Sequence, residues 1–152
     1  MSTTRVTRHM RAPRAAIYRA LVDPAAVARW MVPEGMTSEV HTFEARVGGA
    51  FRISLTYEAP GSQGKSSAHT DTYHGRFVEL VPDEKVVQSM EFETADAAMQ
   101  GEMTVTFTLR DDAGGTELVG VHEGVPPGVA PEDNEEGWGM AFDKLAALVD
   151  RA

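Results

Sequence analysis

The segment 101–112 (GEMTVTFTLRDD) alternates apolar and polar side chains more cleanly than any other part of the chain. Met103, Val105, Phe107 and Leu109 are separated by threonines. A period of two is typical of a β-strand with one face in the core and the other toward water. The glycine-containing turn DAGG joins this segment to another of the same kind, so the pattern predicts an antiparallel hairpin.

Further segments are predicted to be strands of the same sheet. The turns between them are short, and Gly48 and Gly49, for example, supply the positive φ angles that a tight reversal needs. One connection, residues 60–70 (PGSQGKSSAHT), is expected to be a flexible polar loop. The further predicted strands are residues 4–10, 38–45, 50–59, 71–82, 85–94 and 116–124.

Residues 11–30 (RAPRAAIYRALVDPAAVARW) interrupt the strands with two predicted short helices. Pro13 suits the first turn of one helix. Asp23 is a good N-cap for the next, and Pro24 suits its first position. The apolar stripe of the first helix comprises Ala16, Ile17, Ala20 and Leu21.

A longer helix is predicted near the C-terminus. Asn134 is its expected N-cap, followed by Glu135 and Glu136 in the first turn, where the positive end of the helix dipole favours acidic side chains. The apolar stripe has the spacing i, i+3, i+4, i+7 and comprises Trp138, Ala141, Phe142, Leu145, Leu148 and Val149.

The order of these elements predicts an α+β fold in a single domain, residues 1–152. We expect a curved antiparallel sheet of about 6–7 strands around a long C-terminal helix, with two short helices between the first and second strands. A helix that lies across a curled sheet touches it along a line and leaves a gap on one side. The sequence therefore predicts a pocket between the sheet and the last helix.

The acidic balance of the chain limits its partners. The formal net charge is −9, from 23 acidic and 14 basic residues, so neither nucleic acid nor an anionic membrane surface is an expected partner. There is no cysteine, which excludes disulfides, thiolate metal sites and cysteine nucleophiles. The N-terminus lacks an apolar signal core and no run of about 18 apolar residues occurs, so we expect a cytoplasmic protein, monomeric or homodimeric.

Five stretches of the sequence carry a family resemblance, and together they cover nearly the whole chain. They are APRAAIYRALVDPAAVARW (12–30), ARVGGAF (45–51), YHGRFVELVPDEKVV (73–87), TELVGVHEGVP (116–126) and GWGMAFDKLAALV (137–149). In this order they resemble the activator of Hsp90 ATPase homologue 1-like family. That family is a bacterial branch of the helix-grip (SRPBCC) superfamily, which includes START lipid-transfer domains and the Bet v 1-like pollen-allergen fold.

The resemblance implies the helix-grip fold and leaves several activities open. Members of the superfamily bind lipids, hormones and polyketides, and some catalyse cyclisation or hydrolysis. The family name also suggests a co-chaperone. The eukaryotic co-chaperone is similar only in its C-terminal domain, and we do not expect this chain to hold the separate N-terminal domain that engages the chaperone.

The candidate ligand-binding residues are aromatic and methionine side chains, joined by a few polar ones. Such side chains usually fill a core, but as a set in a helix-grip fold they predict an apolar, adaptable cavity wall. The inward-facing polar candidates are Tyr57, Gln88 and His122, which would anchor a ligand or bond within the core. The apolar candidates are Trp30, Phe51, Ile53, Met90, Phe92, Met103, Phe107, Trp138 and Phe142.

No catalytic residue, metal site or cofactor is assigned. His122 has two interpretations, an acid–base group at the pocket mouth or a hydrogen-bonded structural histidine, and we favour the second. Residues 69–74 (HTDTYH) place His69, Asp71 and Tyr73 on one face, too few ligands for zinc, so a solvated strand face is expected. Residues 131–136 (PEDNEE) lack the pattern of a calcium loop.

Three functions remain in order of preference. The first is binding of a hydrophobic or aromatic small molecule, lipid- or polyketide-like, with access past residues 31–37, 60–70 and 125–133. The second is a cyclase or hydrolase that uses the same cavity, with His122 or Tyr57 as the acid–base group. The third is a co-chaperone interaction module, which would need an exposed apolar patch on the outer face of the sheet.

Overall fold

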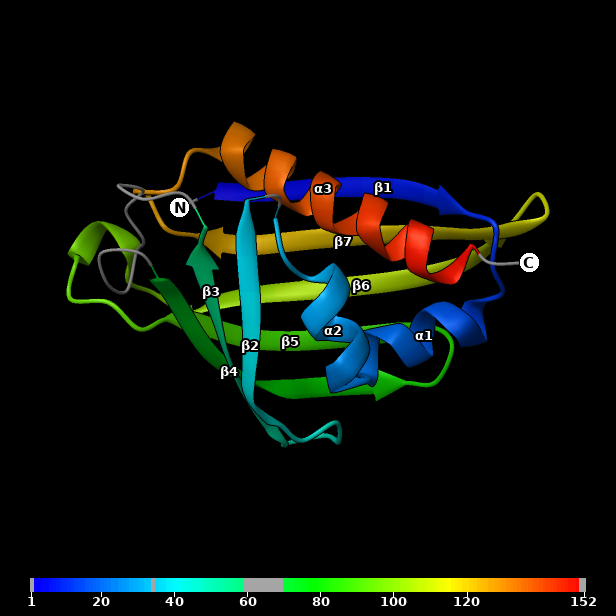
Figure 1. Cartoon of the computed structure of the whole chain (residues 1–152), viewed down its shortest axis with the longest axis horizontal. Coiled ribbons are helices and arrows are strands. Elements are labelled where there is room, and N and C mark those ends of the chain that lie inside the picture. The colour runs from blue at the N-terminus through cyan, green and yellow to red at the C-terminus, as the bar shows by residue number, and fades with distance from the viewer. Residues whose placement is uncertain (1, 34, 59–69, 151–152) are drawn as a thin grey trace.

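The computed structural model describes residues 2–33, 35–58 and 70–150 and has the predicted α+β architecture (Figure 1). Seven strands form one antiparallel sheet in the order β1-β7-β6-β5-β4-β3-β2. The strands are β1 (Ser2–Met10), β2 (Met36–Phe43), β3 (Ala50–Tyr57), β4 (Thr70–Val81), β5 (Lys85–Phe92), β6 (Met103–Asp112) and β7 (Gly115–Val125). The helices are α1 (Arg14–Val22), α2 (Pro24–Trp30) and α3 (Pro131–Val149), with a short 3₁₀ turn at Ala97–Met99 that the sequence analysis did not anticipate.

The sheet bends strongly around α3. In Figure 1, β2 and β3 run steeply across the view, whereas β1, β7 and β6 run along it, beside α3. Helices α1 and α2 carry the chain from β1 at one edge to β2 at the other, and both contact α3. This is the helix-grip arrangement, with one long helix held inside a curled antiparallel sheet.

With one exception, the local signals at the turns and at α2 act as expected. The carboxylate of Asp23 accepts a hydrogen bond from the Ala25 amide at 3.1 Å, which caps α2, and Pro24 occupies its first turn. Gly48 has a φ of 82° in the turn before β3, but the predicted positive φ of Gly49 is wrong. Residue 49 needs to be a glycine for a different reason, because a Cβ there would collide with the carbonyl oxygen of Glu44. The predicted loop 60–70 lies outside the described residues except for Thr70, which begins β4.

The prediction of Asn134 as the N-cap of α3 is wrong. The helix begins one turn earlier, with Ala130 as its N-cap and Pro131 at its first position, so Glu132 and Asp133 are the acidic residues of the first turn. Proline has no N–H to leave unbonded and its φ is already helical, so Pro131 sets the start. Asn134 is therefore inside the helix, and its side chain is free to reach another element.

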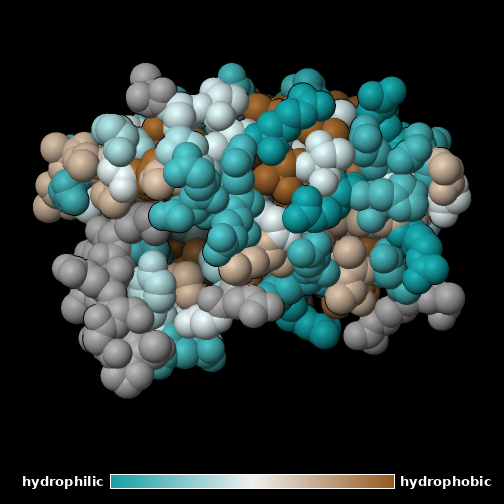
Figure 2. Space-filling model, turned by 90° about the horizontal axis from the view of Figure 1, so that it is seen from above, coloured by the Kyte–Doolittle hydropathy of each residue, from teal (hydrophilic) through white to brown (hydrophobic). Residues whose placement is uncertain are grey.

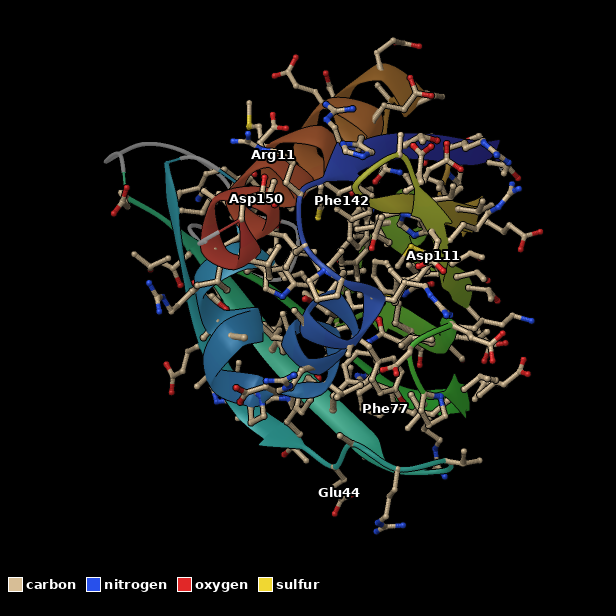
Figure 3. All side chains as sticks on the ribbon, turned by 90° about the vertical axis from the view of Figure 1, so that its right-hand side faces the viewer. Arg11, Glu44, Phe77, Asp111, Phe142 and Asp150 are labelled. Atoms are coloured by element: carbon tan, nitrogen blue, oxygen red, sulfur yellow. The ribbon has the colours of Figure 1, made fainter. Side chains whose placement is uncertain are left out.

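Aromatic side chains fill one half of the space between α3 and the sheet. Phe142 of α3 and Phe77 of β4 both point into this interior, whereas Glu44 lies at the outer edge of the molecule (Figure 3). Phe142 packs where Gly120 of β7 leaves room, since a Cβ at residue 120 would lie 2.7 Å from the Phe142 ring. Trp30 of α2 completes this cluster and donates its indole N–H to the carbonyl oxygen of Ala20 at 2.9 Å.

Candidate functional site

The other end of the concave face is hollow. A cavity of about 450 Å³ lies there between the N-terminal half of α3 and the sheet, within the range of ~300–1,000 Å³ typical of small-molecule sites. Tyr57 ends β3, Asp71 is near the start of β4, Phe92 ends β5 and Met103 begins β6, and all four line the cavity. These chain positions meet because neighbouring strands run in opposite directions.

The wall of the cavity is mostly apolar and rich in methionine. Five of the eight methionines of the chain line it, although lining residues are a small part of the sequence. Methionine side chains are unbranched and polarisable, so a wall made from them adapts to ligands of different shape. The apolar side chains of the wall are Met31, Val32, Pro33, Met36, Leu55, Met90, Phe92, Met103, Val129, Ala130, Met140 and Ala141.

His122 on β7 is the centre of a hydrogen-bond network in the wall. Its Nδ1 accepts a hydrogen bond from the indole N–H of Trp138 at 3.1 Å, and the amide nitrogen of Asn134 lies 3.1 Å from the same atom. The Asn134 amide also donates to the hydroxyl of Thr4 on β1 at 2.6 Å. On the other side of the ring, Nε2 lies 3.0 Å from the sulfur of Met103.

This geometry fixes the protonation state of the ring. An indole nitrogen can only donate, so Nδ1 of His122 carries no proton, and the neutral ring holds its proton on Nε2, toward the sulfur of Met103. Burial lowers the pKa of His122 from 6.5 to about 4, because the charged ring would lose most of its hydration. His122 is therefore a neutral, fully bonded imidazole at pH 7. The favoured interpretation of it as a structural histidine matches this arrangement.

Asp71 and Tyr73 of β4 also line the cavity, so the expected solvated face at residues 69–74 is wrong for these two residues. Asp71 is 2% exposed and Tyr73 6% exposed. The hydroxyl of Tyr73 donates to the sulfur of Met31 at 3.3 Å, and burial raises the pKa of this phenol. His74 is on the outer face, where its two nitrogens lie 2.9 Å from Glu93 and 3.2 Å from Glu91.

The comparisons with known proteins follow this geometry. Residues 11–150 match the family of activator of Hsp90 ATPase homolog 1-like proteins. The chain belongs to that family. Among curated proteins, none matches the chain.

Solved structures of other proteins have the same fold. Protein CV1439 from Chromobacterium violaceum is 36% identical, with a TM-score of 0.89 over 99% of this chain and 98% of that one. The AHSA1 protein SPO3351 from Silicibacter pomeroyi is 20% identical, with a TM-score of 0.77 over 97% and 96%. Protein MLL2253 from Mesorhizobium loti is 24% identical, with a TM-score of 0.73 over 99% and 98%. At these lower identities the likeness concerns the fold alone.

Within this helix-grip fold, six of the twelve candidate binding residues lie on the cavity wall: Tyr57, Met90, Phe92, Met103, His122 and Trp138. The other six, Trp30, Phe51, Ile53, Gln88, Phe107 and Phe142, are buried in the packed half of the interior, so the structure does not place them on the wall. They face the same interior as the wall residues but lie farther from the end of the sheet where the cavity is. Whether any of the twelve contacts a ligand stays a prediction.

The sequence reasoning missed two kinds of wall residue. Asp71 and Tyr73 face inward at the cavity end of β4, and their alternation with Thr72 and His74, together with the hairpin register, could have shown this. Asn134 was missed because its role depends on contacts with β1 and β7, which are far away in the sequence. The expected access segments 31–37 and 125–133 do contribute wall residues at 31–33, 36, 128–130 and 133.

No metal centre is found in the part of the chain that the structure describes, where no group of three or more His, Asp or Glu side chains is placed to hold an ion. His69, which was considered as a possible zinc ligand, lies outside the described residues. None of the described helices has the length and apolar character that a membrane span needs.

Proposed function

We propose that the protein binds an apolar or aromatic small molecule in the cavity between α3 and the sheet. The observation that carries this proposal is the cavity itself, which has a volume of about 450 Å³ and is lined by methionine and aromatic side chains. Removing apolar ligand surface from water supplies the driving force, roughly 25 cal/mol per Å². The polar side chains of His122, Trp138 and Asn134 bond to one another, so an apolar ligand can lie against them without leaving those bonds unmade.

The expected affinity is modest for a small probe. At about 0.3 kcal/mol per non-hydrogen atom, a ligand of about a dozen such atoms gains about 4 kcal/mol, which corresponds to a dissociation constant near 1 mM. A larger ligand that fills the cavity would bind more tightly. Small probes therefore need a method that detects millimolar binding.

The two other functions receive less support from the described residues. An acid–base role of His122 would need a ring nitrogen that faces the ligand and changes protonation near pH 7, but both nitrogens already have partners. A co-chaperone surface would need an apolar patch. Val47 and Val78 are the only large exposed hydrophobic side chains among the described residues, and the face in Figure 2 is mostly hydrophilic.

The two tryptophans provide a test with a built-in control. Trp138 lies in the cavity wall, whereas Trp30 is fully buried in the core and bonds to Ala20. In a ¹H–¹⁵N spectrum, titration with the neutral compound 4-phenylbutan-1-ol should shift the indole N–H signal of Trp138 and leave that of Trp30 in place. An unmoved Trp138 signal up to the solubility limit of the probe would contradict the proposal.

A matched pair of variants then tests the location of the probe. Ala141→Leu adds atoms at the cavity wall, and Ala147→Leu makes the same change on an exposed position of α3. We expect the first to weaken probe binding at least fivefold and the second to leave it unchanged. If Ala141→Leu does not fold, as the Trp30 signal would reveal, Gly137→Leu takes its place, because a Cβ at residue 137 meets nothing within 4 Å.

A further inference from the structure

A serine and a histidine share a hydrogen bond on the outer face of the sheet. Nε2 of His41 on β2 lies 2.8 Å from the hydroxyl oxygen of Ser54 on β3. Nδ1 of the same ring lies 3.5 Å from a carboxylate oxygen of Glu39. None of these three residues lines the cavity beneath α3. A hydroxyl, an imidazole and a carboxylate in this order are the groups that make a serine nucleophilic in acyl transfer.

A bulge in β2 brings the histidine to the serine. Glu39 is directly opposite Ser54 in the antiparallel pair, so these two side chains share a face of the sheet. The register shifts just after Val40, which makes His41 the extra residue of the bulge. In regular pairing His41 would lie opposite Arg52 instead. Bulges turn side chains in this way and are frequent beside active sites.

The hydroxyl of Ser54 is held from its other side by Thr72 on β4. The two hydroxyl oxygens are 2.8 Å apart, and Thr72 is 7% exposed. When the Thr72 hydroxyl donates to Ser54, the single Ser54 proton points at Nε2 of His41. The carboxylate of Glu39 can only accept a proton bond, so it favours the ring with its proton on Nδ1 and a lone pair on Nε2. In that state the ring is placed to act as the base for Ser54.

The surroundings of the pair limit the substrates that could react. The side chain of His41 is 29% exposed and Ser54 is half-buried, so a reactant can reach both from solvent. Arg52 lies on the same face, two residues or about 7 Å along β3 from Ser54, but its guanidinium is bound to Glu93 at 2.8 and 2.9 Å. Its charge therefore stabilises a developing oxyanion only weakly. Esters with a good leaving group, which need little such help, are the matching substrates.

We propose that Ser54 and His41 form a second site, independent of the cavity, that hydrolyses small esters with good leaving groups, such as aryl acetates. Oγ of Ser54 bonds to the carbonyl carbon while its proton passes to Nε2 of His41. Nε2 then gives that proton to the leaving oxygen as the ester C–O bond breaks. Water next attacks the acyl-serine and loses a proton to Nε2, which passes it to Oγ as the carboxylic acid leaves. Glu39 is a positioning residue for the ring.

The direct test is the hydrolysis of 4-nitrophenyl acetate at pH 8, followed by the absorbance of 4-nitrophenolate. We expect Ser54→Ala and His41→Gln each to lower the rate above that of the buffer by at least about tenfold. Ser89→Ala is the matched control, because it removes a half-buried serine hydroxyl from the outer face of β5, and it should change the rate less than about twofold. If Ser54→Ala keeps more than half of the rate, other groups hydrolyse the ester and the proposal is overturned.

A second measurement needs no change at Ser54 and tests the direction of the hydrogen bond. The ¹⁵N shifts of the His41 ring at pH 8 distinguish a proton on Nδ1 from one on Nε2. We expect the proton on Nδ1, and in Glu39→Ala a shift of the ring population toward Nε2 with a rate about two- to fivefold lower. A carboxylate with a merely structural role would leave this tautomer unchanged in the variant. A proton on Nε2 in the original protein would make the ring a donor to Ser54, unable to take its proton, and would overturn the proposal.

Discussion

The buried neutral state of His122 predicts a specific loss of stability in mild acid. The pKa of this ring is about 4 in the folded protein and about 6.5 when the ring is in water. Between these values the unfolded chain binds a proton that the folded chain does not. The stability contributed by this difference is therefore complete above about pH 6.5 and is lost as the pH falls toward about 4.

The size of the effect follows from the same two values. Each pH unit in this window changes the unfolding free energy by about 1.4 kcal/mol for one proton, so lowering the pH from 7.5 to 5 should cost about 2 kcal/mol. With a urea m-value near 2 kcal/mol per M for a domain of this size, the unfolding midpoint should fall by about 1 M. Circular dichroism at several pH values measures this midpoint.

One variant separates the effect of His122 from that of the other ionisable groups. His122→Gln removes the buried ring, so the difference in unfolding free energy between the original protein and this variant should shrink by about 2 kcal/mol from pH 7.5 to 5. The other ionisable groups are the same in both proteins, so their contributions to this difference cancel. A difference for His122→Gln that stays constant within about 0.5 kcal/mol would refute the reasoning, because the ring would then titrate alike in both states.

Three further predictions concern stability and are checked by urea denaturation at pH 7. Gly120→Ala should lower the unfolding free energy by about 1–3 kcal/mol, because its Cβ would lie 2.7 Å from Phe142. Gly137→Ala should raise the unfolding free energy by up to about 1 kcal/mol, because its Cβ meets open space in a helix interior. A change of the same sign in both variants would contradict this reasoning. Asp23→Ala should cost about 1 kcal/mol through loss of the bond that caps α2, and no change would show that the cap is not made in solution. Gln88→Met should be neutral or stabilising by about 1 kcal/mol, since the Gln88 carbonyl oxygen is buried without a partner among the described residues, and a clear loss would show that a partner exists.

The fold was predictable because its signals are local. The alternation along 103–109, the cap at Asp23 and the glycine turn before β3 each specify one element from a few residues, and short turns then leave an antiparallel sheet as the expected result. The start of α3 was not predictable with the same rules, because Asn134 and Pro131 are both good starting signals. The choice between them depends on whether the Asn134 side chain has a partner elsewhere, and that partner is Thr4.

Only half of the cavity wall was predictable, because a side chain that faces the interior of the protein does not necessarily line the cavity. Met103 and Phe107 lie on the same face of β6, yet only Met103 lines the cavity. The alternation of a strand gives the face, while the position along the strand decides between cavity and core. A position along a strand can be assigned to the cavity or to the core only when it is known which end of the sheet α1 and α2 cover. That depends on where the chain crosses from β1 to β2.

The way in which α3 is held explains why the interior stays open at one end. At Gly120 the missing side chain lets Phe142 approach the sheet closely, where its ring centre lies 6.2 Å from that of Phe107. About one turn earlier, the indole of Trp138 bonds to the ring of His122, so two large side chains separate helix and strand. Closing the cavity would require α3 to pivot about Phe142 and to break the bonds of Trp138 and Asn134 to His122, each worth about 1 kcal/mol and more once a buried group is left unsatisfied. The same network that bonds both nitrogens of His122 thus keeps α3 away from β7 and holds the cavity open.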